Sequence, residues 1–238
     1  MLTTTLQANM MHSTTDNCPY CQGEGVLYIN NNTVTDCPCA AYRKKQQKVY
    51  QLFKSARVPK RYQVKSLKNY DQARQPKAYK FALDYLTNWR ENLKSGKSLF
   101  FVGDVGTGKS HLAYAILNGL IKRGVPGIAA SVPDLMDDLR DFDDSGRIEA
   151  LKEIDLLVLD DLGSQKNSEW VTERLFIILN ARYSELKPTI ITSNHRLEVL
   201  EKTSGWERIV DRIIEMCDIV LVNGESYRKS QRRRSDNG

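Results

Sequence analysis

The chain has 238 residues, 41% of them hydrophobic, and a formal net charge of +6. This length allows one globular domain of ordinary size with a small appendage, and no apolar run approaches the roughly 20 residues that a membrane-spanning helix needs. The first fifteen residues lack a basic start followed by an apolar block, so we expect no secretory signal and a cytoplasmic protein.

The charge is distributed unevenly along the chain. Residues 1–98 contain 16 lysines and arginines against 6 acidic residues, whereas residues 99–238 contain 19 against 23. A basic first part favours nucleic acid or an acidic protein surface as its partner. A solvated, lysine-rich helix would give the same imbalance, so charge alone leaves both interpretations open.

A cysteine cluster follows residues 1–15, which are polar and expected to be disordered. Four of the five cysteines fall within 22 residues, at Cys18, Cys21, Cys37 and Cys39. Two close pairs of thiolates are typical of a tetrahedral Zn²⁺ site. A pair of disulfides is the alternative, which a reducing cytosol disfavours. A small hairpin, formed by residues 26–29 and 34–35, is expected to join the two pairs.

Two helical patterns lie between the cysteines and the rest of the chain. Residues 41–56 combine basic side chains with an imperfect apolar stripe, which predicts a basic helix that ends before Pro59. With the cysteines, this helix makes up a predicted module of residues 16–56. A second helical pattern, at residues 78–89, leads into a larger domain.

From residue 99 onward, strand and helix patterns alternate, which predicts an α/β domain with a parallel sheet between helices. The expected strands are residues 99–102, 127–131, 155–160, 189–193 and 218–222. The expected helices are residues 109–123, 133–141, 147–153, 168–185, 196–202 and 206–216. Cys217 lies in an apolar strand and is expected to be an inert core residue. Residues 229–238 form a basic tail that we expect to be frayed.

A glycine-rich loop separates the first strand of this domain from its first helix. It matches the pattern G-x-x-x-x-G-K-[ST] with Gly103, Asp104, Val105, Gly106, Thr107, Gly108, Lys109 and Ser110, followed by His111. Backbone N–H groups of such a loop, together with the helix N-terminus, surround phosphates. Lys109 can reach the β- and γ-phosphates, and the Ser110 hydroxyl can bind Mg²⁺. The sequence therefore predicts a nucleotide site.

Polar side chains end two later strands. Asp160 and Asp161 close an apolar strand whose carboxyl end would lie beside the glycine loop. There Asp160 would hold Mg²⁺ and Asp161 would polarise the attacking water, although two turn-forming aspartates would give the same pattern. Asn194 follows the next strand and is a candidate to orient the water, although asparagine is also a common turn residue.

Three arginines near the end of the chain are further candidates. Arg208 and Arg212 lie one helical turn apart on one face. A guanidinium there can neutralise transition-state charge on a γ-phosphate held by a neighbouring subunit. A surface ion pair is the alternative. Arg228, after the last strand, is a candidate to sense the nucleotide within its own subunit.

The motifs GDVGTGKSHL, LLVLDDLG, TSN, ERIVDRI and GESYR occur in this order. Together they resemble the DnaC/DnaI-type replicative helicase loaders, a branch of the AAA+ ATPases, over residues 57–228. The resemblance implies an AAA+ core with a five-stranded parallel sheet, ATP hydrolysis with Mg²⁺, and self-association on ATP binding. It assigns the nucleotide contacts to Lys109 and Ser110, the acidic pair to Asp160 and Asp161, the first sensor to Asn194, the trans-acting arginine to Arg212 with Arg208 beside it, and the second sensor to Arg228.

The resemblance also implies partners. DnaI-like loaders carry an N-terminal zinc module that grips the helicase, so residues 16–56 would bind a hexameric DnaB-type helicase for loading onto single-stranded DNA. The family's DNA-binding insertion corresponds to residues 132–153, whose run of aspartates makes a poor DNA surface. An IstB-like transposition ATPase that binds DNA, and a non-enzymatic DNA-binding adaptor, remain as alternatives.

Overall fold

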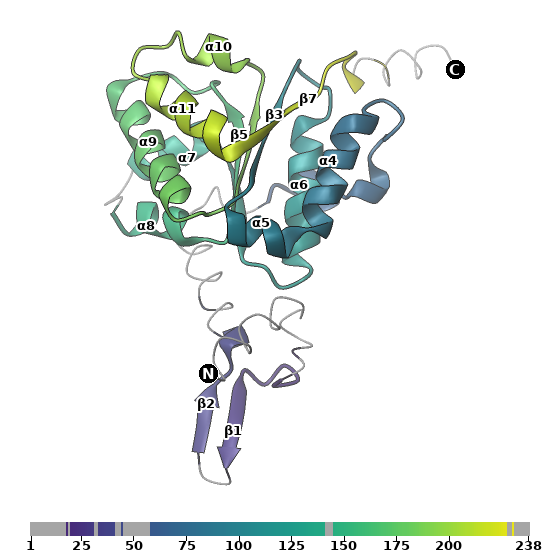
Figure 1. Ribbon diagram of the computed structural model, residues 1–238, viewed down its shortest axis with the longest axis vertical. Coiled ribbons are helices and arrows are strands. Elements are labelled where there is room, and N and C mark those ends of the chain that lie inside the picture. Colours follow the sequence, from purple (N-terminus) through teal and green to yellow (C-terminus); the bar gives the residue numbers. More distant parts are fainter. Residues whose placement is uncertain are drawn as a thin grey trace.

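The computed structural model (Figure 1) describes residues 18, 20–30, 33–40, 44, 58–140, 145–227 and 230. The expected disorder of residues 1–15, nearly all of the basic helix at 41–56, Arg228 and nearly all of the tail lie outside these residues. Within the described part of the chain, no helix is both long and apolar enough to cross a membrane.

The cysteine segment contains the expected hairpin. Strands β1 (Val26–Asn30) and β2 (Thr33–Asp36) pair antiparallel, with Val26 opposite Asp36. The buried residues of this segment are the four cysteines, against which Tyr20 and Leu27 pack. So small a core does not stabilise a fold without a cross-link or a metal.

The larger domain is built on the predicted parallel sheet. Its strands are β3 (Ser98–Val102), β4 (Gly127–Ser131), β5 (Leu156–Leu162), β6 (Thr189–Ser193) and β7 (Cys217–Leu221). They lie in the order β4-β5-β6-β3-β7, and every neighbouring pair is parallel. The first four strands are almost completely buried, which is why their sequences are continuous apolar runs.

Helices cover both faces of this sheet (Figure 1). One face packs against α7 (Val132–Arg140), α8 (Ser145–Glu153), α9 (Glu169–Ser184) and α11 (Glu207–Met216). The other face packs against α4 (Pro76–Thr87), α5 (Trp89–Ser95) and α6 (Lys109–Ile121). Each face therefore has its own hydrophobic core.

The structure differs from the expected elements in a few places. The helical pattern at residues 78–89 forms two helices, because Asn88 leaves the helical conformation between α4 and α5. Helix α10 (Leu197–Leu200) is shorter than expected, and β5 continues two residues beyond its expected end. Two short elements, α3 (Lys60–Gln63) and the 3₁₀-helix η3 (Leu67–Asn69), have too few residues to show a periodic pattern.

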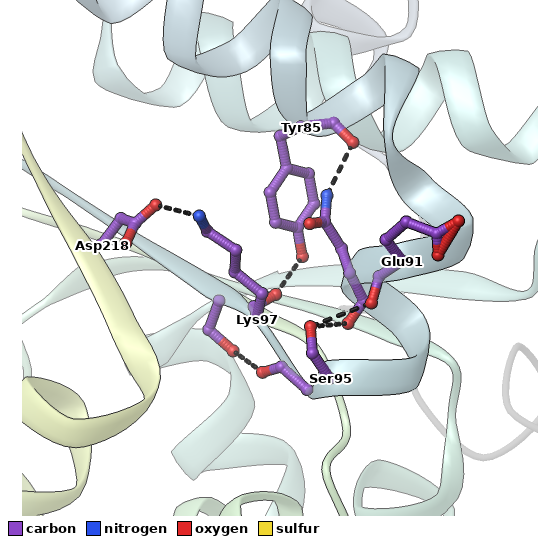
Figure 2. Close-up of polar contacts among 8 residues, drawn as sticks. Tyr85, Glu91, Ser95, Lys97 and Asp218 are labelled. Atoms are coloured by element: carbon purple, nitrogen blue, oxygen red, sulfur yellow. Dashed lines mark hydrogen bonds and ion pairs between the residues drawn. The ribbon is translucent and has the colours of Figure 1, made fainter.

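Polar contacts fix the start of β3 (Figure 2). The Tyr85 hydroxyl on α4 donates to the Lys97 carbonyl at 2.8 Å, and the Asn92 amide on α5 donates to the Tyr85 carbonyl at 2.9 Å. The Lys97 ammonium lies 2.8 Å from the Asp218 carboxylate on β7. These contacts hold α4, α5 and β7 around the strand that leads into the glycine loop.

The strand order brings the candidate residues together. Strand β6 lies between β3, which precedes the glycine loop, and β5, which carries the two aspartates. The carboxyl ends of parallel strands meet at one edge of a sheet, where ligands of α/β proteins bind. The glycine loop, Asp160, Asp161 and Asn194 therefore meet at that edge.

Candidate nucleotide site and candidate metal centre

The glycine loop is shaped by close neighbours. Gly106 has φ of +83°, and a Cβ there would collide with the Ser226 side chain. Gly108 has φ of +109°, and a Cβ there would lie 2.9 Å from the Tyr70 hydroxyl. Both positions therefore require glycine. Helix α6 begins directly after the loop, at Lys109, so the N–H groups of its first turn face the same space.

Lys109 is buried and bonded within its own site. Its ammonium donates to the carbonyls of Gly103 and Asp104, both at 2.7 Å, and to Asn194 Oδ1 at 2.8 Å. These three bonds match the three donors of an ammonium group. The lysine is thus held over the loop, where an incoming phosphate oxygen would compete with the two carbonyls.

Asp160 and Ser110 form a pair of adjacent oxygen donors. Asp160 is 6% exposed, accepts a hydrogen bond from Thr192 Oγ1 at 2.6 Å, and also bonds to the Ser110 side chain. Burial raises the pKa of the Asp160 carboxyl, and the two hydroxyl groups partly offset this effect. A hydroxyl and a carboxylate in contact are hard oxygen ligands that fit Mg²⁺.

Asp161 lies in an irregularity that the sequence did not predict. The pairing of β5 with β6 shifts register between Leu159 and Leu162, and Asp161 has φ of +63°. Its N–H donates to Thr192 Oγ1 at 2.9 Å, and its carboxylate accepts from Asn194 Nδ2 at 2.7 Å. The bulge therefore turns the carboxylate toward Asn194, which bridges Asp161 and Lys109.

A cavity of about 340 Å³ lies over these groups, a size typical of small-ligand sites. The glycine loop, both aspartates, Thr192 and Asn194 line it. The segment before α4 also lines it, through Arg61, Tyr62, Lys65, Asn69, Tyr70, Asp71 and Arg74. Motif reasoning missed this second wall. The only signal for it is a mixture of basic and aromatic residues between positions 60 and 75.

Tyr70 and His111 connect that wall to helix α6. Their rings meet edge to face at 5.1 Å, and His111 Nε2 lies 3.0 Å from Asn69 Oδ1. Burial lowers the pKa of His111 and raises that of Tyr70 to about 12, so both side chains are neutral at physiological pH. The Tyr70 hydroxyl is buried and has no hydrogen-bond partner among the described residues.

The two arginines of α11 lie away from this cavity. The Arg208 guanidinium is 4.4 Å from the Phe176 ring centroid. Arg212 donates to Asn180 Oδ1 at 3.1 Å and lies 2.9 Å from Asp211 and 3.5 Å from Glu215. Arg212 therefore forms the surface ion pair that the sequence suggested as an alternative. Its side chain is still 28% exposed.

The cysteine cluster forms a candidate metal centre. The sulfur atoms of Cys18, Cys21, Cys37 and Cys39 are buried and lie within 4.8 Å of one another. None of the four forms a disulfide; the Cys18 and Cys37 sulfurs are 3.7 Å apart and the Cys21 and Cys39 sulfurs are 3.4 Å apart. Tetrahedral Zn–S bonds of about 2.3 Å place sulfurs about 3.8 Å apart, so the set fits zinc. Cys217 is buried in β7, far along the chain.

Comparison with known proteins places this geometry in a family. The family model for the IstB-like ATP binding protein matches residues 40–235. The replicative helicase loader DnaC of Escherichia coli K12 is 37% identical over 138 residues, 55% of this chain and 56% of that protein. The present chain thus spans about half the length of the DnaC proteins it matches.

Solved structures agree with this result. The crystal structure of the DnaC helicase loader aligns with a TM-score of 0.60 and 32% identity, over 69% of this chain and 99% of the other. The crystal structure of DnaI aligns with a TM-score of 0.63 and 28% identity, over 75% and 98%. The expected AAA+ fold and the resemblance to helicase loaders are thereby confirmed. The chain belongs to the IstB-like ATP-binding protein family.

Proposed function

We propose that this protein is an ATPase that loads a hexameric, DnaB-type helicase onto single-stranded DNA. One observation carries the enzymatic part of this proposal. A phosphate-binding lysine and a potential water-activating carboxylate, Lys109 and Asp161, face one cavity and are joined through Asn194. A site that only held nucleotide as a structural ligand would not need the second group, which argues against a non-enzymatic adaptor.

The contacts support a role for each residue. ATP phosphates draw Lys109 away from the carbonyls of Gly103 and Asp104, while N–H groups of residues 103–111 bind the remaining oxygens. Ser110 and Asp160 would hold Mg²⁺, which neutralises phosphate charge. The second N–H of the Asn194 amide would then donate to the γ-phosphate, while the first keeps donating to Asp161 and orients its carboxylate toward the attacking water. Asn194 thus responds to the presence of the third phosphate.

Arg212 is proposed to complete the site of a neighbouring subunit. It does not line the cavity of its own chain, and its exposed fraction leaves it accessible. Self-association on ATP binding would bring it to a neighbouring γ-phosphate, with Arg208 supporting the same face. Arg228, the proposed second sensor, lies outside the described residues.

The cysteine module, residues 16–56, is proposed to bind zinc and the helicase. The relative DnaC is a replicative helicase loader. The hairpin of this module exposes Tyr28, Ile29 and Val34, with Tyr28 73% exposed. Exposed apolar side chains on a metal-braced hairpin suit a protein contact.

Co-elution with a purified DnaB-type hexamer tests this function. We expect a complex with the full chain, and helicase-dependent unwinding of a closed single-stranded circle carrying an annealed oligonucleotide. The double variant Tyr28→Ser/Ile29→Ser should lose the complex but still bind ATP, while Lys77→Ala, an exposed change on α4, should behave as wild type. Absence of any complex, with duplex DNA bound instead, would favour the alternative of an IstB-like transposition ATPase, since an insertion sequence ATP-binding protein is also a relative.

A further inference from the structure

The segment after β7, which we call the C-terminal segment (residues 222–227 and 230), lies against the glycine loop. The Tyr227 N–H donates to the Gly106 carbonyl at 2.9 Å, and the Ser226 side chain occupies the space beside Gly106. The Val222 carbonyl fills the corresponding space at Gly103. Tyr227 also lines the cavity. Any displacement of this segment therefore changes the wall of the proposed nucleotide site.

Arg74 holds this segment from the opposite side. Its two terminal nitrogens donate to Ser230 Oγ and to the Glu225 carbonyl, each at 2.8 Å. Its guanidinium also lies 5.4 Å from the centroid of the Tyr227 ring. The neighbouring Gln75 amide bonds to the Asn223 carbonyl. Contacts from two adjacent residues thus span about 150 positions of sequence and bring the two ends of the ATPase domain together.

We propose that Arg74 is a positioning residue that clamps the C-terminal segment onto the glycine loop and thereby slows nucleotide release. The inference rests on the proposed nucleotide site. A planar guanidinium offers two donors at a fixed angle, so it bonds both acceptors only when Glu225 and Ser230 are held in one arrangement. A lysine keeps the charge but lacks this fork. The geometry of the side chain, rather than its charge alone, therefore fixes the segment.

The test uses the full chain with Arg74→Ala and Arg74→Lys. Dissociation of a fluorescent ATP analogue should accelerate about tenfold in both variants, as expected for the loss of a charge-assisted hydrogen bond. Trypsin cleavage after Arg228 and Lys229 should also accelerate without nucleotide, while the thermal midpoint stays close to wild type. Lys77→Ala removes a cation three residues away and serves as the control.

Two outcomes would overturn the proposal. Wild-type dissociation and cleavage rates in Arg74→Ala would show that the clamp does not hold the segment. Wild-type behaviour of Arg74→Lys alone would show that the charge acts directly on the nucleotide. If Arg74→Ala folds poorly, Ser230→Ala decides, because it removes the acceptor of one Arg74 bond and leaves the arginine in place. Dissociation should then accelerate as well, and a wild-type dissociation rate in Ser230→Ala would overturn the proposal. None of these measurements involves helicase or DNA, so a failed loading assay remains a separate result.

Discussion

The hydroxyl of Thr192 forms hydrogen bonds with both acidic residues of the candidate site. Its removal should lower the stability of the fold and the rate of ATP hydrolysis but leave nucleotide affinity almost unchanged. Thr192 Oγ1 donates to Asp160 and accepts from the Asp161 N–H. Thr192→Val keeps the shape but loses both bonds. A hydrogen bond to a charged group contributes about 1.5–3 kcal/mol, and a buried unpaired N–H costs about 1–3 kcal/mol. We expect the free energy of unfolding to fall by about 2.5–6 kcal/mol, the sum of the two effects.

The catalytic effect follows from the bulge at Asp161. Without the Thr192 hydroxyl the backbone of Asp161 loses its anchor, so its carboxylate no longer points consistently at the attacking water. We expect kcat for ATP hydrolysis to fall about 10- to 100-fold, less than the roughly 10²- to 10⁴-fold that a correctly placed general base contributes. The dissociation constant of an ATP analogue should change little, because the contacts of Lys109 remain.

Urea unfolding followed by circular dichroism and steady-state ATP turnover provide the two measurements. Thr192→Ser is the matched control, because it retains the hydroxyl and should keep most of the activity. The reasoning is refuted if Thr192→Val keeps wild-type turnover, or if the serine variant loses as much activity as the valine variant.

Three further predictions concern the metal sites and assembly. Because burial raises the pKa of Asp160, its ionised form destabilises the folded chain above that pKa. Asp160→Asn should therefore raise the thermal midpoint of the nucleotide-free protein near neutral pH, by an amount that shrinks as the pH falls, while Mg²⁺-dependent ATP binding is lost. Elemental analysis should find one zinc per chain, and Cys37→Ser should lose it; metal-free protein with disulfides would contradict this. Arg212→Ala and Lys109→Ala chains, each inactive alone, should regain hydrolysis when mixed, and continued inactivity despite co-assembly would exclude a trans role for Arg212.

The sequence predicted the parts of the site that depend on local chemistry. The glycine loop and the buried strands follow from residue order alone, because each needs particular residue types at fixed spacing. The bulge at Asp161 does not, since it depends on how β5 pairs with β6. The division between residues 16–56 and 57–228 stays a prediction.

Arg182 shows why a buried polar network escapes sequence reasoning. It lies on α9, where a helical arginine is normally solvated, yet it is completely buried. Its guanidinium donates to the carbonyls of Leu151 and Ile154 and to Thr189 Oγ1, among others. Burial lowers the pKa of Arg182 to about 9. Its acceptors come from the ends of α8 and the starts of β5 and β6, so only the folded chain reveals them.

The bonds of Lys109 to the loop carbonyls have a consequence for the ligand selectivity of the proposed nucleotide site. The carbonyls of Gly103 and Asp104 already accept hydrogen bonds from the Lys109 ammonium, so any anion that approaches the loop must compete with them for it. A small anion such as free phosphate would form few new hydrogen bonds in place of the two that Lys109 gives up, so its net binding free energy would be small. A triphosphate offers several oxygens to the lysine and to the loop N–H groups at once, which outweighs the bonds that are lost. If the loop binds nucleotide as proposed, it would discriminate by the number of oxygens that a ligand presents together.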